Sequence, residues 1–229
     1  MAGPRVTSIR RYPVKAMGGE PLQAVDLDAR GLVGDRWFAV VDEDGRLAAG
    51  KTSRRFRRHD EVFAYAAATD GEDVVVTRAG ERWTVGDPAL DEELGTAFGA
   101  PVRVLPEGDV RHQDAGQVSL VGTATLAWCA DRWGIDPDPR RLRVNLLVAT
   151  DEPFVEESWT GSALTVGGAH LRVVQRIDRC RTIDVAQDGA EARGPWLRHL
   201  AAERDLFLAV YADVATPGRI EVGDEVVVG

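Results

Sequence analysis

Residues 37–45 read Trp37-Phe38-Ala39-Val40-Val41-Asp42-Glu43-Asp44-Gly45, an apolar run that ends at a turn signal. A similar pattern appears further on, where Asp70-Gly71 precedes Val74-Val75-Val76. Short runs rich in β-branched and aromatic residues, bounded by Asp-Gly turns, are typical of strands with tight connections. The pattern extends from Val6 to Val85 and predicts a β-meander or a small barrel.

A helix is expected after these strands. Asp87 suits the N-cap position and Pro88 the first helical position. Gly99 suits the end of the helix, after apolar residues that recur every four positions: Leu90, Leu94 and Phe98. We expect a domain boundary here, with a first domain at residues 1–99 and a second at 100–229.

The second part is also expected to be mainly β, decorated with helices. Thr123 is expected to cap a helix whose apolar face holds Leu126, Cys129, Ala130 and Trp133, so Cys129 is interpreted as a core residue. Residues 107–116 show no periodicity and predict a loop of a length that often carries function. The remaining predicted elements are strands at 102–104, 145–149, 171–177, 207–214, 219–222 and 225–228 and a helix at 195–204. The fold class is therefore mainly β, of the β-barrel type, with peripheral helices.

Composition excludes several classes of protein. With 229 residues, 44% of them hydrophobic, the chain can bury a sizeable core. Its net charge of -9 disfavours nucleic acid and anionic membranes as partners. Residues 1–11 lack the apolar core of a signal peptide, and no stretch approaches the roughly 20 apolar residues of a membrane span. The two cysteines, Cys129 and Cys180, are too few for a disulfide framework, so we expect a cytoplasmic protein.

Cys180 is the candidate reactive group. It follows an apolar strand and lies between Arg179 and Arg181, and nearby positive charge favours the thiolate form that acts as a nucleophile or metal ligand. The alternative is a small, half-buried residue at a strand end, which is common for free cysteine. Further cationic segments, around Lys15, Arg36 and residues 140–143, suit a phosphorylated cofactor if they converge, and are surface charges if they do not.

Six short segments, taken in order along the chain, resemble the MOSC (molybdenum-cofactor sulfurase C-terminal) domain with its N-terminal β-barrel domain in front. The family elements are YPVKS, GL…DR[WF], FRPN, E..W…L.IG, RC..T and PG.I.VGD. The corresponding segments here are Tyr12-Pro13-Val14-Lys15, Gly31-Leu32 with Asp35-Arg36-Trp37, Arg143-Val144-Asn145, Glu157-Ser158-Trp159 with Leu164-Thr165-Val166-Gly167, Arg179-Cys180-Arg181-Thr182, and Pro217-Gly218-Arg219-Ile220-Glu221-Val222-Gly223-Asp224. Each segment is weak alone, but their order over most of the chain is specific. The resemblance implies that an N-terminal β-barrel domain packs on a MOSC β-barrel domain.

The resemblance also implies a cofactor. Relatives such as the mitochondrial amidoxime-reducing component and its bacterial counterparts bind molybdenum cofactor, a molybdopterin-bound metal, between the two domains. By the same resemblance Cys180 is the catalytic residue and protein ligand to molybdenum, and the cofactor-binding residues are Lys15, Arg36, Arg143, Asn145, Arg179 and Tyr211. Two departures alter the pattern, because Ala16 replaces the serine of YPVKS and Val144 replaces the proline of FRPN.

The function implied is a molybdenum-dependent oxidoreductase that reduces N-hydroxylated or N-oxide small molecules. The chain lacks the four-cysteine iron–sulfur set of some bacterial relatives, so the expected electron donor is a separate ferredoxin-like or flavin-reductase-like protein. Two alternatives stay open: sulfur transfer through a persulfide on Cys180, and a non-catalytic carrier of molybdenum cofactor.

Overall fold

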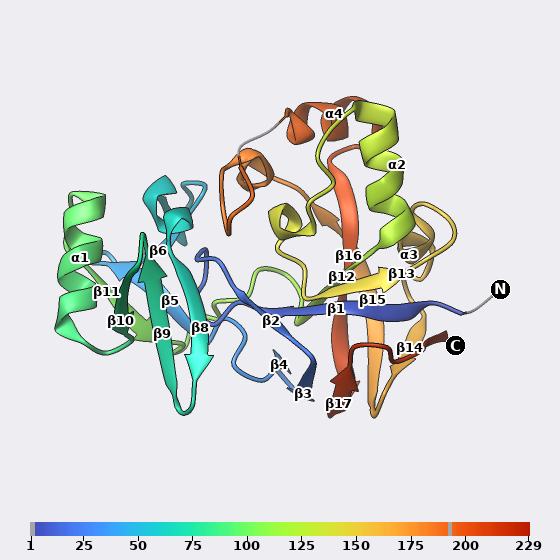
Figure 1. Ribbon diagram of the computed structural model, residues 1–229, viewed down its shortest axis with the longest axis horizontal. Helices are drawn as coiled ribbons and strands as arrows, with labels where there is room; N and C mark the ends of the chain where they lie inside the picture. Colours follow the sequence, from blue (N-terminus) through green and yellow to red (C-terminus); the bar gives the residue numbers. More distant parts are fainter. Residues whose placement is uncertain (1–2, 192–193) are drawn as a thin grey trace.

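Strands outweigh helices in the structure, a computed structural model that describes residues 3–191 and 194–229 (Figure 1). The strands up to the first α-helix are β1 (Arg5–Arg11), β2 (Glu20–Leu22), β3 (Ala24–Asp28), β4 (Gly31–Leu32), β5 (Phe38–Asp42), β6 (Leu47–Ala49), β7 (Phe56–Arg58), β8 (Ala66–Asp70), β9 (Asp73–Arg78) and β10 (Glu81–Thr84). Those after it are β11 (Val102–Pro106), β12 (Val118–Gly122), β13 (Leu146–Ala149), β14 (Ala163–Val166), β15 (Ala169–Asp178), β16 (Phe207–Thr216), β17 (Gly218–Glu221) and β18 (Val226–Val228). The mainly β fold class predicted from the sequence is confirmed.

Helices are short and peripheral. The α-helices are α1 (Pro88–Phe98), α2 (Thr123–Trp133), α3 (Val155–Ser158) and α4 (Trp196–Glu203), and the 3-10 helices are η1 (Asp60–Ala64), η2 (Pro139–Leu142) and η3 (Arg181–Asp184). Helix α1 begins and ends as the sequence predicts. The Asp87 side chain accepts a hydrogen bond from the Ala89 amide, and Gly99 closes the helix in the left-handed conformation.

The cap predicted for α2 is wrong by one residue. Gly122 occupies the N-cap position and makes no side-chain capping bond, while Oγ1 of Thr123 accepts a hydrogen bond from the Thr150 amide at 3.2 Å. The buried face of α2 holds Leu126, Cys129 and Trp133 as expected, but Thr125 is buried instead of Ala130. Thr125 belongs to this face because its hydroxyl donates to the buried Glu156 carboxylate at 2.9 Å.

An eight-stranded sheet forms the larger half of the molecule, in the order β18-β14-β15-β16-β12-β13-β1-β2. The smaller half holds a four-stranded sheet, β11-β5-β6-β7, and a three-stranded sheet, β10-β9-β8, with α1 packed against them (Figure 1). Most neighbouring strands are antiparallel, whereas β12 with β13 and β6 with β7 are parallel. Separate apolar clusters fill the two halves, as expected for two packed β units.

Strands from the two ends of the chain are interleaved. β1 lies between β13 and β2 in the large sheet, β3 pairs with β17 near the C-terminus, and β11 pairs with β5. Strands from both sides of residue 99 therefore share sheets, and the division into 1–99 and 100–229 stays a prediction about folding units. Within the part of the chain that the structure describes, no helix has the length and apolar character needed to cross a membrane.

Candidate functional site

A cavity of about 880 Å³ is lined by residues from both halves of the molecule. The first half contributes the turn after β1 and the segment between β6 and η1, and the second half contributes η2, the end of β15 and part of β16. Six residues predicted for the site line this cavity: Lys15, Arg36, Arg143, Arg179, Cys180 and Tyr211. The fold therefore brings together residues that are up to 196 positions apart in the sequence.

Cys180 is half-buried at the end of β15, where the strand turns into η3. Its thiol donates a hydrogen bond to Oγ1 of Thr182 at 3.4 Å. Cys129, in contrast, is fully buried on α2, and burial raises the pKa of its thiol to about 12. The sequence-based distinction between a cavity cysteine and a core cysteine is confirmed.

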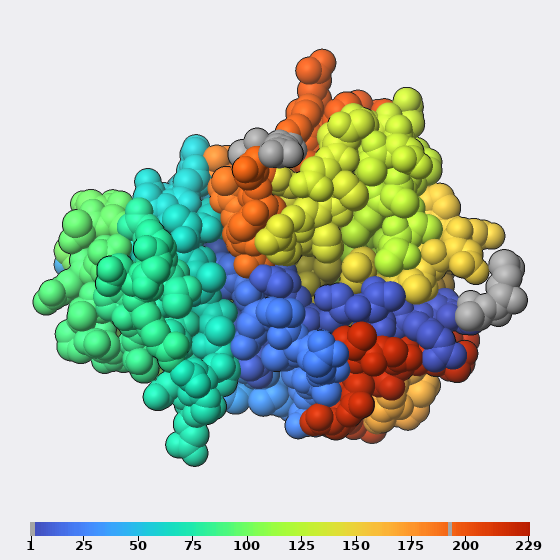
Figure 2. Space-filling model, in the orientation of Figure 1, coloured from blue at the N-terminus to red at the C-terminus, as the bar shows by residue number. Residues whose placement is uncertain are grey.

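The two arginines that flank Cys180 have different roles. Arg179 lines the cavity and donates to the carbonyl oxygen of Leu142 at 2.5 Å, and burial lowers the pKa of its guanidinium. Arg181 points to the other half, where it binds both carboxylate oxygens of Asp60 at 2.6 and 2.9 Å and the carbonyl of Gly50. The segment that follows Cys180 consequently lies against both halves, as the orange surface in Figure 2 shows.

Close approach at Gly50 depends on its missing side chain. A Cβ atom at this position would lie 2.5 Å from Oγ1 of Thr182, which is the hydroxyl that contacts Cys180. Glycine therefore lets the first half of the molecule pack directly against the cysteine segment.

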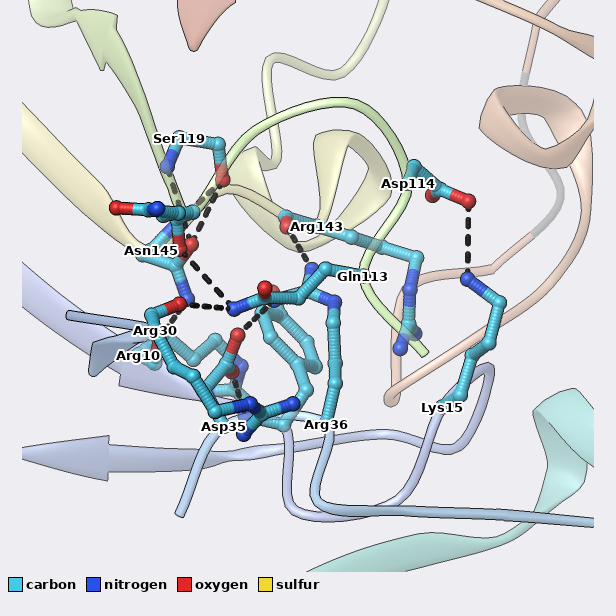
Figure 3. A network of polar contacts seen from close by, with 12 residues as sticks. Arg10, Lys15, Arg30, Asp35, Arg36, Gln113, Asp114, Ser119, Arg143 and Asn145 are labelled. Atoms are coloured by element: carbon cyan, nitrogen blue, oxygen red, sulfur yellow. Dashed lines mark hydrogen bonds and ion pairs between the residues drawn. The ribbon is translucent and has the colours of Figure 1, made fainter. Parts of the chain in front are cut away.

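Arg36 and Arg143 both line the cavity, and both contact the ring of Tyr12. Both arginines have a φ of 54°, a left-handed conformation that is uncommon for non-glycine residues. Their guanidinium groups lie over the Tyr12 ring, with centroid distances of 5.0 Å for Arg36 and 4.5 Å for Arg143. Figure 3 shows the two side chains running side by side, and Arg36 reaches the backbone carbonyl of Arg143 at 3.0 Å.

Their charges are balanced differently. Arg36 forms an ion pair with the buried Asp35; burial alone would lower the pKa of Arg36, but Asp35 and Asp114 outweigh burial and raise it. Arg143 donates only to neutral groups, chiefly the Met17 carbonyl at 2.7 Å, and burial lowers the pKa of its guanidinium to about 10. Arg143 is therefore a cation without a carboxylate partner in the described structure, available for an anionic ligand.

Lys15 enters the cavity from the turn after β1 and pairs with Asp114 at 2.9 Å. Burial lowers the pKa of Lys15 despite this partner. For Asp114 the charged neighbours dominate instead of burial. Burial would raise the pKa of its carboxyl, but Lys15 and Arg36 outweigh it and lower this pKa below the usual range. Asp114, whose side chain is about half exposed, thus supplies a negative charge at the edge of this group of cations (Figure 3).

Asn145 does not line the cavity. Its side-chain oxygen accepts bonds from the amide and hydroxyl of Ser119, at 3.1 and 2.9 Å, and its amide nitrogen donates to the Arg10 carbonyl at 3.2 Å. Ser119 does line the cavity. Asn145 therefore lies behind Ser119 as seen from the cavity. Its side chain links β12 and β1 at the residue that precedes β13.

Two family models match this chain. The MOSC domain matches residues 107–227, and the MOSC N-terminal beta barrel domain matches residues 3–87. The chain belongs to the MOSC family. Residues 88–106, which contain α1 and β11, separate the two matches.

Known proteins similar to this MOSC chain include the molybdenum cofactor sulfurase of Danio rerio, which is 24% identical over 250 residues. The match covers 86% of this chain but only 30% of the sulfurase, so the chain spans less than a third of that protein. Among solved structures, the YuaD protein of Bacillus subtilis has a TM-score of 0.51 at 14% identity, and the alignment covers 97% of this chain and 93% of that one. The YiiM protein of Geobacillus stearothermophilus has a TM-score of 0.39 at 15% identity over 50% of this chain and 54% of its own. At these identities YuaD supports the fold of the MOSC chain.

Sequence reasoning missed several residues that line the MOSC cavity. Asp114 lies in the loop without periodicity, and Lys51 lies in a cationic run that resembles none of the quoted family segments. Arg141 was visible only as one member of a charged run, and nothing in that run distinguishes a buried arginine from exposed ones. The charges of these residues can be read from the sequence, but only the folded structure shows that they line the cavity.

The donor set fits a large anionic cofactor that brings its own metal ligands. Lysine and arginine outnumber aspartate and glutamate among the lining residues, although acids outnumber bases, 37 to 28, in the whole chain. Arg141 is fully buried and leaves its guanidinium nitrogens without partners. Within residues 3–191 and 194–229, no group of three or more His, Cys, Asp or Glu residues could hold a metal ion by itself. A soft metal centre carried by such a cofactor would therefore find one soft ligand, Cys180, in a cavity wall rich in lysine and arginine.

Proposed function

We propose that this protein binds molybdenum cofactor in the cavity between its halves and reduces N-hydroxylated or N-oxide small molecules, with Cys180 as protein ligand to molybdenum. The observation that carries the proposal is the convergence of Cys180, Lys15, Arg36, Arg143 and Arg179 on one cavity. When bound, the cofactor supplies two-electron redox chemistry, while the protein binds, orients and shields it.

The four cationic residues have different partners in the structure, so we expect them to contribute to cofactor binding in different ways. Arg143 and Arg179 donate only to uncharged partners, so charge-assisted hydrogen bonds to phosphate or pterin oxygens remain available to them. Lys15 must exchange its partner Asp114, or share it, when an anion arrives. Arg36 keeps its buried partner Asp35 and positions the backbone of Arg143.

The proposed reduction consumes protons, and a residue of the cavity wall is placed to hold one. Breaking the N–O bond of an amidoxime with two electrons and two protons gives an amidine and water. Tyr211 lines the cavity, and burial raises the pKa of its hydroxyl, so this group keeps its proton at neutral pH. We propose that Tyr211 holds a proton at its hydroxyl oxygen near the reacting group and excludes bulk water together with Phe207.

Electrons are proposed to come from a separate ferredoxin-like or flavin-reductase-like protein. Support comes from the rim segment, defined here as residues 51–58, which carries cations and no acidic residue: Lys51, Arg54, Arg55, Arg57 and Arg58. Lys51 and Phe56 of this segment line the cavity, so a donor bound there would be near Cys180. Arg54 is exposed, and no carboxylate of the described residues lies within 4.0 Å of it. A free thiol of this kind suits a reducing compartment such as the cytoplasm.

Similarity to a molybdenum cofactor sulfurase favours a second candidate, sulfur transfer through a Cys180 persulfide. The two candidates differ in what Cys180 carries. A metal ligand requires molybdenum at near one atom per chain, whereas a sulfur carrier requires a cyanide-releasable sulfur atom on Cys180 without molybdenum. A non-catalytic carrier would hold molybdenum and reduce nothing.

The deciding experiment is elemental analysis of protein purified from molybdate-supplied cells, followed by turnover of benzamidoxime with a chemical electron donor. We expect molybdenum and benzamidine formation in the wild type, and loss of turnover per bound molybdenum in Cys180→Ala. Cys129→Ala is the matched control and should keep both. Full turnover per molybdenum in Cys180→Ala would exclude the ligand role.

A further inference from the structure

Arg141 differs from every neighbouring arginine of its segment. It lies on η2 with 0% of its surface exposed, and it is among the largest fully buried side chains of the described structure. Nε, Nη1 and Nη2 all lack a hydrogen-bond partner among the described residues, and no carboxylate there lies within 4.0 Å. Arg140, one residue earlier, pairs with Asp138 at 2.5 Å and also donates to the Asp188 carbonyl.

An isolated buried guanidinium is costly. Arginine stays protonated in proteins, so it cannot avoid the cost by losing its proton. Removing a charge from water without a compensating partner opposes folding, and an apolar side chain of similar size does not carry this cost. The cofactor-free protein therefore carries a destabilising side chain in its interior, which calls for a partner that is absent from the chain itself.

The location indicates where this partner binds. Arg141 is one of the residues that line the cavity, and η2 packs against η3, the turn that follows Cys180. The next two residues also face the cavity, with the Leu142 carbonyl bound by Arg179 and the Arg143 carbonyl bound by Arg36. An anion in this corner of the cavity would therefore meet a wall already built from arginines.

We propose that Arg141 is the buried anchor of an oxyanion site, and that a phosphate-like group supplies its missing partner. The planar guanidinium matches two oxygens of such a group at once, which lysine cannot do. Because its nitrogens are covered in the ligand-free protein, binding would require the side chain to turn toward the cavity. The inference goes beyond the proposed function, since the site needs an oxyanion but not molybdenum.

Stability of the cofactor-free protein tests this inference without any assay of activity. Arg141→Met removes the unpaired charge and keeps the length of the side chain, so we expect the unfolding midpoint Tm to rise by about 3 °C or more. Arg140→Met is the matched control, and its Tm should stay level or fall because Arg140 has partners to lose. A fall in Tm for Arg141→Met would mean that the side chain supports the fold and would overturn the proposal.

Inorganic phosphate is the probe for the anion. Phosphate should raise the Tm of the wild type and of Arg140→Met, and calorimetric affinity should fall at least about tenfold in Arg141→Met. Arg141→Lys keeps the charge without the bidentate geometry and should bind phosphate more weakly than the wild type. If Arg141→Met does not fold, Arg141→Lys decides: unchanged affinity for phosphate overturns the proposal.

The source of the oxyanion follows from two further measurements. If Arg141→Met loses free phosphate binding and also retains less cofactor after purification, the natural partner is the phosphate of the cofactor. If it loses free phosphate binding but keeps the cofactor, the site serves a free oxyanion or an anionic substrate. Both results support the anchor, and molybdenum content, measured separately, decides the proposed function.

Discussion

Arg36 donates a hydrogen bond to the backbone carbonyl of Arg143 at 3.0 Å, which joins two cationic residues that lie 107 positions apart. Both adopt the left-handed conformation and both lie over the Tyr12 ring. Two positive side chains can share this corner because Asp35 neutralises one of them. Their contributions to stability and to ligand binding should therefore differ.

Replacing Arg36 with Gln should destabilise the protein more than replacing Arg143 with Gln. The first change leaves the buried Asp35 carboxylate without its cation, at a cost of about 3 kcal/mol or more. The second removes a hydrogen bond to a carbonyl and a ring contact, worth about 1 kcal/mol. Urea unfolding of the cofactor-free variants measures both values. Equal losses would show that Asp35 does not depend on Arg36.

The two cysteines should react at very different rates with a thiol reagent. Cys180 lies in the cavity and should be labelled in the native protein, whereas Cys129 should react only on unfolding, since its thiol is buried and its pKa is raised to about 12. Mass spectrometry of the labelled wild type, with Cys180→Ser and Cys129→Ser as controls, separates the two sites. Labelling of native Cys180→Ser would contradict the assignment of Cys129 to the core.

Local patterns predicted local structure well. Asp87 and Gly99 mark both ends of α1 because capping depends on neighbouring residues alone. The pairings of β1 with β13 and of β3 with β17 were not predictable, since nothing within a short strand names a partner more than a hundred residues away. Thr123 was taken as a cap although its hydroxyl is used by Thr150, a contact that exists only after folding.

The candidate site was predicted in a similar way. Resemblance to the family motifs placed Lys15, Arg36, Arg143, Arg179, Cys180 and Tyr211 around one cofactor, and all of them line the cavity. Their roles stay predictions. Asn145 belongs to the same motif as Arg143, yet its side-chain amide lies behind the cavity wall, where it binds Ser119. Asp114 and Arg141 were missed because their significance comes from what surrounds them rather than from the residues beside them in the sequence.

Acid should weaken the contact between η1 and the cysteine segment. Hydrogen bonds from Arg181, and then from Arg58, lower the pKa of Asp60 from 3.8 to about 2 against the effect of burial. Because the folded pKa is depressed, the stabilising contribution of Asp60 is fully present above about pH 4 and is lost as the pH falls toward 2. The gap in Tm between wild type and Asp60→Asn should therefore close over this range. Asp26→Asn, an exposed carboxylate, is the control, and a gap that stays constant would contradict the assignment.

Reversal of one charge in the rim segment tests the route of electron delivery. Arg54 is exposed, pairs with no described carboxylate and does not line the cavity, so Arg54→Glu should leave turnover with a chemical electron donor unchanged. With a plant-type ferredoxin, which is acidic, as the donor, opposite charges steer association and kcat/KM should fall about three- to tenfold at low ionic strength. The loss should shrink at 0.15 M salt, where the screening length is about 8 Å. Arg103→Glu, on the exposed side of β11, carries the same charge change outside the rim segment and should behave as the wild type. Equal losses in the two variants would show that only the net charge of the protein matters, and no loss in either would place the donor on another face.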